Sequence, residues 1–395
     1  MASLQTQPAA RLANDILLQI FYHLETDESL CVVALVCHSW KIPAQVLLYI
    51  TICFSAWDPT DSTSFERSNL FARTMHTAPP LARLVRYLSL HTDADVIRDQ
   101  IEWLHLLPEH GLNRFRYMWS SENTFDPYIL VAPAVRTVTH FIAHGPQNPS
   151  SLRTCLSLPN LETLEVSLAD CDNDAGWRDW EIHASLAPRL RKLIIRVYFV
   201  SCPAALSLFA AFAPQLSAFQ LHALYEIFEP HREWAAALTS PLGSHLKQLV
   251  LSGSICWTKD GRPFMDDVVR RRQSRSLELI RCPQGSYTDA FFRHLPSTVQ
   301  TLELYVDVPH SRFAHERALV ELLREVTQGR RQSSLKEVRF LSQYRTTLPL
   351  SSEVIEAFRE SGVRLTCERA ELYTPVQYMA EADIVESSFS SEFCH

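Results

Sequence analysis

The chain has 395 residues, 47% of them hydrophobic, and its 44 acidic and 37 basic side chains give a net charge of −7. A chain of this length can bury more than one core, so we expect a small module and a long body. The mild acidic balance provides no basic surface for nucleic acid or for an anionic membrane. We therefore expect protein partners, with no nucleic acid and no membrane among them.

Glycine is scarce, with nine residues in the chain, and no two of them are two positions apart. Rossmann sites, P-loops and the serine-hydrolase elbow all need closely spaced glycines, because the backbone turns sharply there or approaches a ligand closely. The composition thus excludes these three classes of site. We expect no cofactor and assign no catalytic residue.

The first ten residues are polar, and no stretch reaches the roughly 18 uninterrupted apolar residues of a membrane helix. We therefore expect a cytoplasmic and/or nuclear protein. Its ten cysteines are scattered through the sequence, and in these reducing compartments they should remain free thiols.

Residues 10–50 are predicted to form a helical module. Apolar residues between Asn14 and Leu24 recur at helical spacing, and Asn14 is a suitable N-cap. A second helix is expected after Asp27 and a third from Pro43, before a β-rich run at 49–54. The second helix is expected to bury Leu30, Val33, Ala34 and Cys37.

Three short helices cannot bury this much apolar surface among themselves, because domains of about 40 residues usually need a staple or a partner. Part of the surface must therefore face something else. It could cap the following body, or it could be a docking site for another protein. Periodicity alone does not separate these two interpretations.

The order of residues from Arg11 to Ile50 resembles the F-box family. The resemblance lies in the start at Leu12, the Ile-Leu-x-x-Ile-Phe helix at 16–21 and the Val-Cys-x-Ser-Trp close at 36–40. It implies docking onto a Skp-type adaptor and a cullin scaffold within a ubiquitin ligase. The matching positions, some of which should form the module's own core, are Leu12, Ile16, Leu17, Ile20, Leu24, Leu30, Val33, Val36 and Trp40. We expect Leu17 and Trp40 to contribute most, because large central anchors usually carry most of the binding energy.

The rest of the chain repeats one local pattern, an apolar residue, two variable residues and then apolar-x-apolar, after a polar stretch at 58–68 that reads as a loop. The apolar-x-apolar pairs begin 23 to 36 residues apart, mostly near the upper end of the roughly 20–29-residue leucine-rich-repeat period. Their first members are Leu88, Phe115, Val138, Leu164, Leu193, Phe219, Leu249, Leu277, Leu302, Val338 and Val363. Segments 158–166 and 187–195 look like leucine-rich-repeat strands.

Helical patterns alternate with these strands, at 204–212, 265–272, 289–294, 315–326 and 353–360. The predicted fold class is therefore α/β: a small N-terminal three-helix F-box-like module, followed by a leucine-rich-repeat-like solenoid of parallel strands alternating with helices. The expected boundaries are 10–50 for the module, 51–373 for the solenoid and 374–395 for a flexible tail. An ordinary α/β domain with buried parallel strands is the alternative.

The residue between the two apolar members of each pair should face solvent on the sheet. Nine of these eleven middle positions are polar, as an exposed sheet face requires. We expect target binding there, through Arg116, Glu165, Gln220, Glu278, Glu303 and Arg339.

No metal site is predicted. The acidic segment 170–174 resembles a calcium loop, but Ala175 stands where the loop needs glycine. His315 and Glu316 begin an HExxH motif, but Leu319 replaces its second histidine.

The expected function is that of a substrate receptor of a cullin-based, SCF-type ubiquitin ligase with no catalytic site of its own, which supports the degradation of a captured protein. A scaffold without ligase engagement is the first alternative. An enzyme or nucleotide-binding protein on an α/β body is the second, and the shortage of glycine argues against it.

Overall fold

The structure is a computed structural model that describes residues 14–24, 27–55, 62–92, 102–119, 128–144, 149–168, 182–197, 203–223, 234, 236–238, 245–253, 263–271, 276–306, 313–342 and 349–369. Leu12, the acidic segment 170–174 and the tail at 374–395 lie outside the described residues. The chain forms two compact units, Met1–His144 with Leu158–Leu161, and Gly145–Ser157 with Glu162–His395.

The first unit begins with three helices, α1 (Asn14–Tyr22), α2 (Asp27–Val36) and α3 (His38–Ile50). Their common core consists of Leu17, Phe21, Leu30 and Ala44. Leu17 and Phe21 are four residues apart, so they lie on one face of α1. Phe21 also meets the ring of Trp40 edge-on, with the ring centroids 5.4 Å apart.

Two details of this module differ from the sequence prediction. The third helix begins at His38 and not at Pro43, which lies inside α3 and is buried. Proline removes one helical hydrogen bond there, and the helix still continues because its other residues form theirs. Cys37, expected to be buried, is exposed because it is the N-cap between α2 and α3.

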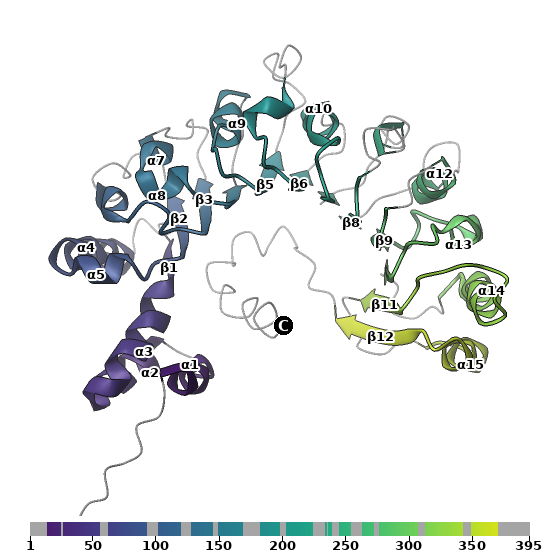
Figure 1. Cartoon of the computed structure of the whole chain (residues 1–395), viewed down its shortest axis with the longest axis horizontal. Coiled ribbons are helices and arrows are strands. Elements are labelled where there is room, and N and C mark those ends of the chain that lie inside the picture. The colour runs from purple at the N-terminus through teal and green to yellow at the C-terminus, as the bar shows by residue number, and fades with distance from the viewer. Residues whose placement is uncertain are drawn as a thin grey trace, which may run out of the picture. The chain divides into compact units, whose positions relative to one another are not determined.

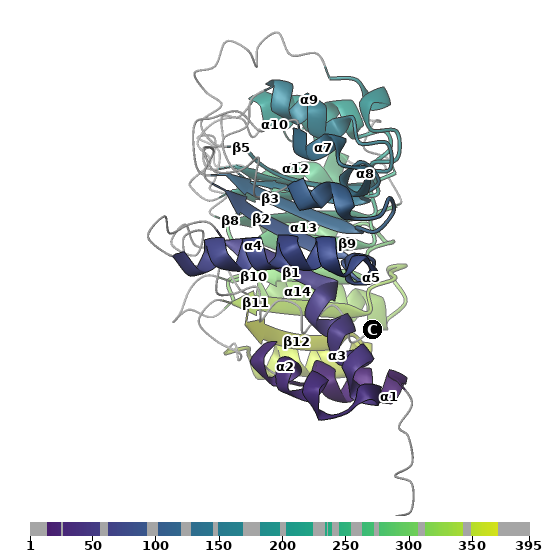
Figure 2. The ribbon, with the colours of Figure 1, turned by 90° about the vertical axis from the view of Figure 1, so that its left-hand side faces the viewer.

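Four parallel strands complete the first unit, separated by short helices. In chain order these elements are β1 (Thr51–Ser55), α4 (Ser62–Thr77), α5 (Pro79–Ala82), β2 (Tyr87–Thr92), η1 (Glu102–Leu106), β3 (Arg114–Trp119), α7 (Tyr128–Val131), α8 (Pro133–Arg136) and β4 (His140–His144). α3 ends at Ile50 and β1 begins at the next residue. Figure 2 shows α3 leading into these strands, with α4 and α5 beside them.

The helix α4 corrects the prediction of a loop at 58–68 over residues 62–68, and residues 58–61 lie outside the described residues. Its first turns are rich in Ser and Thr, which suggested a loop, but the apolar residues that hold it come later. Phe71 packs edge-on against Trp103, with the ring centroids 4.7 Å apart, and Met75 is fully buried one turn further on.

The second unit continues the alternation of helices and parallel strands. Its elements are α9 (Pro149–Leu156), β5 (Thr163–Leu168), η3 (Ala184–Leu186), β6 (Lys192–Val197), α10 (Pro203–Phe212), β7 (Ala218–Ala223), β8 (Gln248–Gly253), α12 (Phe264–Arg271), β9 (Leu279–Pro283), α13 (Asp289–His294), β10 (Thr301–Tyr305), α14 (Glu316–Thr327), β11 (Glu337–Ser342), α15 (Ser352–Ser361) and β12 (Arg364–Arg369). Within this unit the strands form one row and the helices another (Figure 1). The predicted fold class, a helical module followed by a solenoid of parallel strands alternating with helices, is confirmed.

A repeated backbone motif fixes the start of the strands β6 to β11. The carbonyl of the residue that precedes one strand accepts two N–H groups from the beginning of the next strand. Glu162 O accepts from Arg191 N at 2.8 Å and Lys192 N at 3.0 Å, and Gln300 O accepts from Lys336 N and Glu337 N in the same way. Each repeat therefore supplies the hydrogen-bond acceptors for the first N–H groups of the next repeat, which makes stacking of the repeats cooperative.

The strand register confirms most predicted pairs and corrects three. The first apolar position is Phe141 in β4, Ile280 in β9 and Leu365 in β12, where the sequence suggested Val138, Leu277 and Val363. Val138 and Leu277 are each three residues early, because they are the leading apolar residue of the pattern and not part of the pair. Both are fully buried all the same. The strand β1 is a further repeat strand that the sequence pattern did not include, with Ile52 opposite Leu88.

Candidate functional site

The helical module leaves several large apolar side chains in solvent. Ile16 and Ile20 are 46% and 48% exposed on α1, and Leu35 is 87% exposed on α2. Val32, Val36 and Ile42 are also more than half exposed. Ile16 and Ile20 are four residues apart, and Val32, Leu35 and Val36 follow helical spacing, so each group lies on one face of its helix. Contiguous exposed apolar side chains of this size usually mark an interaction site.

The structure separates the predicted adaptor-binding residues into two sets. Ile16, Ile20 and Val36 are exposed, whereas Leu17 and Leu30 are core residues with 1% and 7% exposure. Leu24, Val33 and Trp40 are partly buried and pack against that core. Leu17, which we expected to be a leading contact residue, has its side chain in the core of the folded module. Val32 and Leu35 were missed, although their spacing relative to Val36 is visible in the sequence.

The second candidate site is the sheet face of the second unit that lies opposite the helices. Residues two apart in a strand share a face, so this face carries the middle positions of the second unit's strands and their neighbours at i±2. Glu165 and Arg196, on adjacent strands, form a buried ion pair with Nε and Oε1 2.7 Å apart. His222 and Ser252 are register partners on β7 and β8, and Nδ1 and Oγ are 2.5 Å apart.

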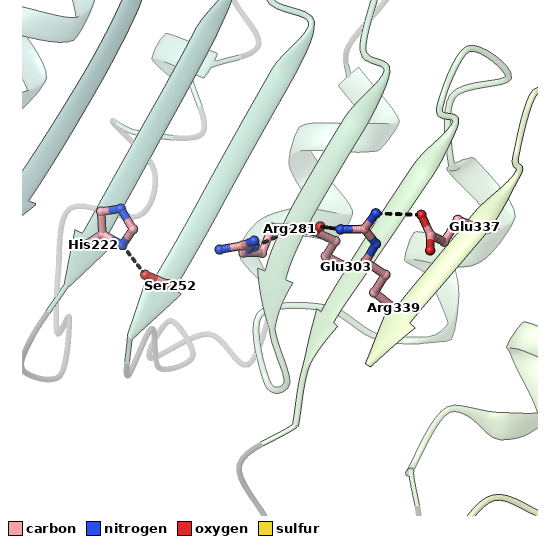
Figure 3. A network of polar contacts seen from close by, with 6 residues as sticks. All are labelled: His222, Ser252, Arg281, Glu303, Glu337 and Arg339. Atoms are coloured by element: carbon pink, nitrogen blue, oxygen red, sulfur yellow. Dashed lines mark hydrogen bonds and ion pairs between the residues drawn. The ribbon is translucent and has the colours of Figure 1, made fainter. Parts of the chain in front are cut away.

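Burial and the nearby Arg196 guanidinium lower the pKa of His222 to about 3. The imidazole is therefore neutral at physiological pH. Which partner donates the hydrogen depends on the tautomer. The pair is one of the polar contacts drawn in Figure 3.

Four strands, β9 to β12, carry an alternating ladder of arginines and glutamates. Figure 3 shows its members on β9 to β11, which are Arg281, Glu303, Arg339 and Glu337. Arg281 Nε donates to Glu303 Oε2 at 2.5 Å, and Arg339 Nη1 approaches Glu303 Oε1 at 3.4 Å. Arg339 Nη2 then bonds Glu337 Oε2 at 2.9 Å, and Arg364 Nε bonds Glu337 Oε1 at 2.8 Å. Each carboxylate is thus held by two guanidinium groups from neighbouring positions.

The ladder is buried at its carboxylates and accessible at its ends. The side chains of Glu303 and Glu337 are 3% and 6% exposed, against 37% for Arg281 and 67% for Arg364. Burial by itself raises the pKa of Glu337, but hydrogen bonds from Arg339 and Arg364 outweigh it and hold that pKa below its usual value. Glu337 therefore stays ionised at physiological pH.

Five of the six predicted target-binding residues lie on sheet strands at the expected middle position. They are Arg116 on β3, Glu165 on β5, Gln220 on β7, Glu303 on β10 and Arg339 on β11. Glu278 is a correction, because it precedes β9 and pairs with Lys247, leaving Arg281 in the middle position. Arg196, Glu337 and Arg281 were missed. The first two lie two residues from a middle position, a spacing that the sequence does show.

Among the described residues, no group of three or more His, Cys, Asp or Glu side chains is arranged to hold a metal ion. None of the helices in the described parts of the chain combines the length and hydropathy needed to cross a bilayer.

The fold and these two surfaces define an α/β solenoid with a helical module at its amino end. Residues 11–55 match the F-box-like family model, so the chain carries an F-box-like domain formed by α1 to α3 and β1. No curated protein matches the chain. A crystal structure of a TLR13–ssRNA13 complex aligns with 73% of this chain at 11% identity and a TM-score of 0.38. The chain spans 40% of the length of that protein.

Proposed function

We propose that this protein is a substrate receptor of an SCF-type, cullin-based ubiquitin ligase. The module at 10–50 docks on a Skp-type adaptor, and the region at 51–373 captures a protein target through its sheet face. Ubiquitin transfer and the degradation signal belong to the other subunits, and the chain itself catalyses nothing. It works in the cytoplasm and/or the nucleus, where such ligases operate.

The observation that carries this proposal is the F-box-like match at 11–55 on a module with apolar side chains in solvent. The docking contacts are the exposed residues Ile16, Ile20, Val32, Leu35 and Val36, together with the accessible part of Trp40. Burying such side chains contributes roughly 1.5–3 kcal/mol each, so a few of them suffice for stable docking. Leu17 and Leu30 support docking indirectly, because they hold the helices together.

The test compares two pairs of charge substitutions with matched side chains and exposure. Ile16→Glu with Val36→Glu changes the module, whereas Ile355→Glu with Val131→Glu changes an isoleucine and a valine that are 47% and 56% exposed elsewhere. Each protein is expressed at endogenous level and co-precipitated, and its adaptor and cullin are quantified. Circular dichroism and thermal unfolding establish that both variants are folded.

We expect the first pair to reduce adaptor recovery at least about tenfold, because a carboxylate in an apolar interface loses its hydration. The second pair should leave recovery unchanged. Equal adaptor recovery with all three proteins would overturn the docking proposal. Recovery of adaptor without cullin would favour a scaffold that does not engage the ligase.

A further inference from the structure

The ladder on β9 to β12 ends in two arginines, each of which bonds a glutamate through one of its three guanidinium nitrogens. Arg281 and Arg364 each bond a glutamate through Nε alone. Within the described part of the chain, the two terminal nitrogens of each guanidinium have no partner. These nitrogens form the edge of the fork that binds a carboxylate through two parallel hydrogen bonds.

The carboxylates inside the ladder cannot accept hydrogen bonds from these terminal nitrogens. Both oxygens of Glu303 and both oxygens of Glu337 already face a guanidinium, and both side chains are almost inaccessible. Arg339 is shared between them, and bonding to Glu337 raises its pKa above the usual value, so it stays charged. The exposed part of the ladder is therefore cationic at both ends, although buried negative charge lies between them.

Exposed Glu368 lies on the same face of β12 and balances the formal charge of three arginines against three glutamates. Net charge does not attract a partner to this face. The attraction is local, at the free edges of Arg281 and Arg364, and it requires carboxylates that reach both.

We propose that this face binds an extended acidic peptide segment of the captured target, with one carboxylate on Arg281 and a second on Arg364. The inference deepens the proposed function and rests on it, because it assigns a chemical class to the target. The partner is a protein segment and not a small anion, since two sites on different strands must be filled at once.

The spacing of the two arginines sets the spacing of the acids. Arg281 and Arg364 are three strands apart and offset by two residues along the strand direction. With about 4.8 Å between strands and about 3.3 Å per residue, this separation is roughly 16 Å. Acids at i and i+4 of an extended peptide lie about 13 Å apart on one side, and their side chains cover the remaining few ångströms.

The probe is a fluorescently labelled peptide with two glutamates four positions apart in a serine–threonine background. Its first control replaces both glutamates by glutamine, and its second places the glutamates next to each other. Binding to the purified full-length chain is measured by anisotropy at two salt concentrations, without adaptor.

The decisive variant is Arg281→Gln with Arg364→Gln. The matched control is Arg324→Gln with Arg359→Gln, which removes the same charge from arginines of α14 and α15 that are 51% and 72% exposed. Both ladder glutamates keep Arg339 as a partner in the decisive variant. Should it unfold, adding Glu303→Gln and Glu337→Gln removes the buried charges as well and keeps the test available.

We expect saturable binding of the i, i+4 peptide, and about fivefold weaker binding for each ladder arginine removed. Binding should weaken with salt and stay unchanged in the helix-side control. Equal binding of the glutamine peptide, absence of saturable binding, or an unaffected ladder variant would overturn the inference. Adaptor recovery, measured on the same proteins, reports the proposed function separately, because it does not involve these arginines.

Discussion

Glu303 illustrates at the residue scale why a sheet face can bury charge without loss of structure. A carboxylate removed from water is costly unless its lone pairs are filled by charged donors. Both oxygens of Glu303 are filled, by Arg281 and Arg339, and its side chain is 3% exposed. The same rule explains Glu337. Removal of Glu303 would leave Arg281 without its carboxylate partner, and removal of Glu337 would do the same to Arg364.

The buried imidazole of His222 makes the stability of the fold depend on pH. Its pKa is about 3 in the folded chain, whereas a histidine in an unfolded chain takes up its proton near pH 6.5. Between these values the unfolded chain binds more protons, so the stability of the fold decreases as the pH falls through this window. Above about pH 6.5 the residue contributes no pH dependence.

We predict that His222→Gln makes the melting temperature fall less steeply between pH 6.5 and 4 than in the unmodified chain. Glutamine can still bond Ser252 but takes up no proton. Thermal unfolding at half-unit pH intervals measures the slope. His245→Gln, at an exposed histidine, is the control and should follow the unmodified chain. Parallel curves for all three proteins would contradict the prediction.

At the scale of elements, the junction between α3 and β1 links the docking module to the first strand. No residue separates the two elements. Phe71 of α4 bridges them, with ring centroids 6.3 Å from Tyr49 of α3 and 5.3 Å from Phe54 of β1. Trp103 closes the cluster and is fully buried. The module is therefore packed onto the strand and not tethered by a linker.

We predict that Phe71→Ala destabilises this junction by about 3 kcal/mol, because it removes a ring from an aromatic cluster. Hydrogen exchange at the amides of 51–55 should become faster, and urea unfolding should give the free energy. Leu70→Ala, at the neighbouring residue that is 51% exposed, should change both quantities little. Unchanged exchange in β1 after Phe71→Ala would mean that the ring does not hold the junction.

At the scale of the whole molecule, the second unit is a stack in which each strand pairs only with its neighbours. Leu302 of β10 is in register with Val338 of β11, whereas Leu164 lies on β5, five strands away along the sheet. All three are fully buried. In such a stack, stability is approximately a sum of repeat and nearest-neighbour terms.

We predict that Leu164→Ala and Leu302→Ala have additive effects on the free energy of unfolding, within about 0.5 kcal/mol. Leu302→Ala and Val338→Ala should instead show a coupling energy above that value, because the two side chains are register partners. Double-mutant cycles by urea denaturation measure both pairs. Strong coupling between Leu164 and Leu302 would show that the unit behaves as one globular core.

Much of this architecture was predictable because it depends on local patterns. Asn14 and the apolar spacing after it located α1, and the range 289–294 predicted for α13 is the one observed. Buried apolar pairs such as Leu164 and Val166 identified their strands, since every unit must bury the same positions to stack. The F-box-like order at 11–50 pointed to the module, and the family match at 11–55 supports it.

Only the tertiary structure decided which of two acceptable apolar residues faces the core and which side chains meet. Leu277 and Ile280 fit the strand pattern equally well, and hydrogen-bond register with β8 and β10 selected Ile280. Leu17 and Ile16 are adjacent in a helix, and packing against α3 buried one and left the other in solvent. The ladder joins Arg281 to Arg364, which are 83 positions apart in the sequence. Sequence periodicity determines which face of an element is apolar, but contacts between strands depend on register and on the neighbour across the sheet, which a local pattern does not contain.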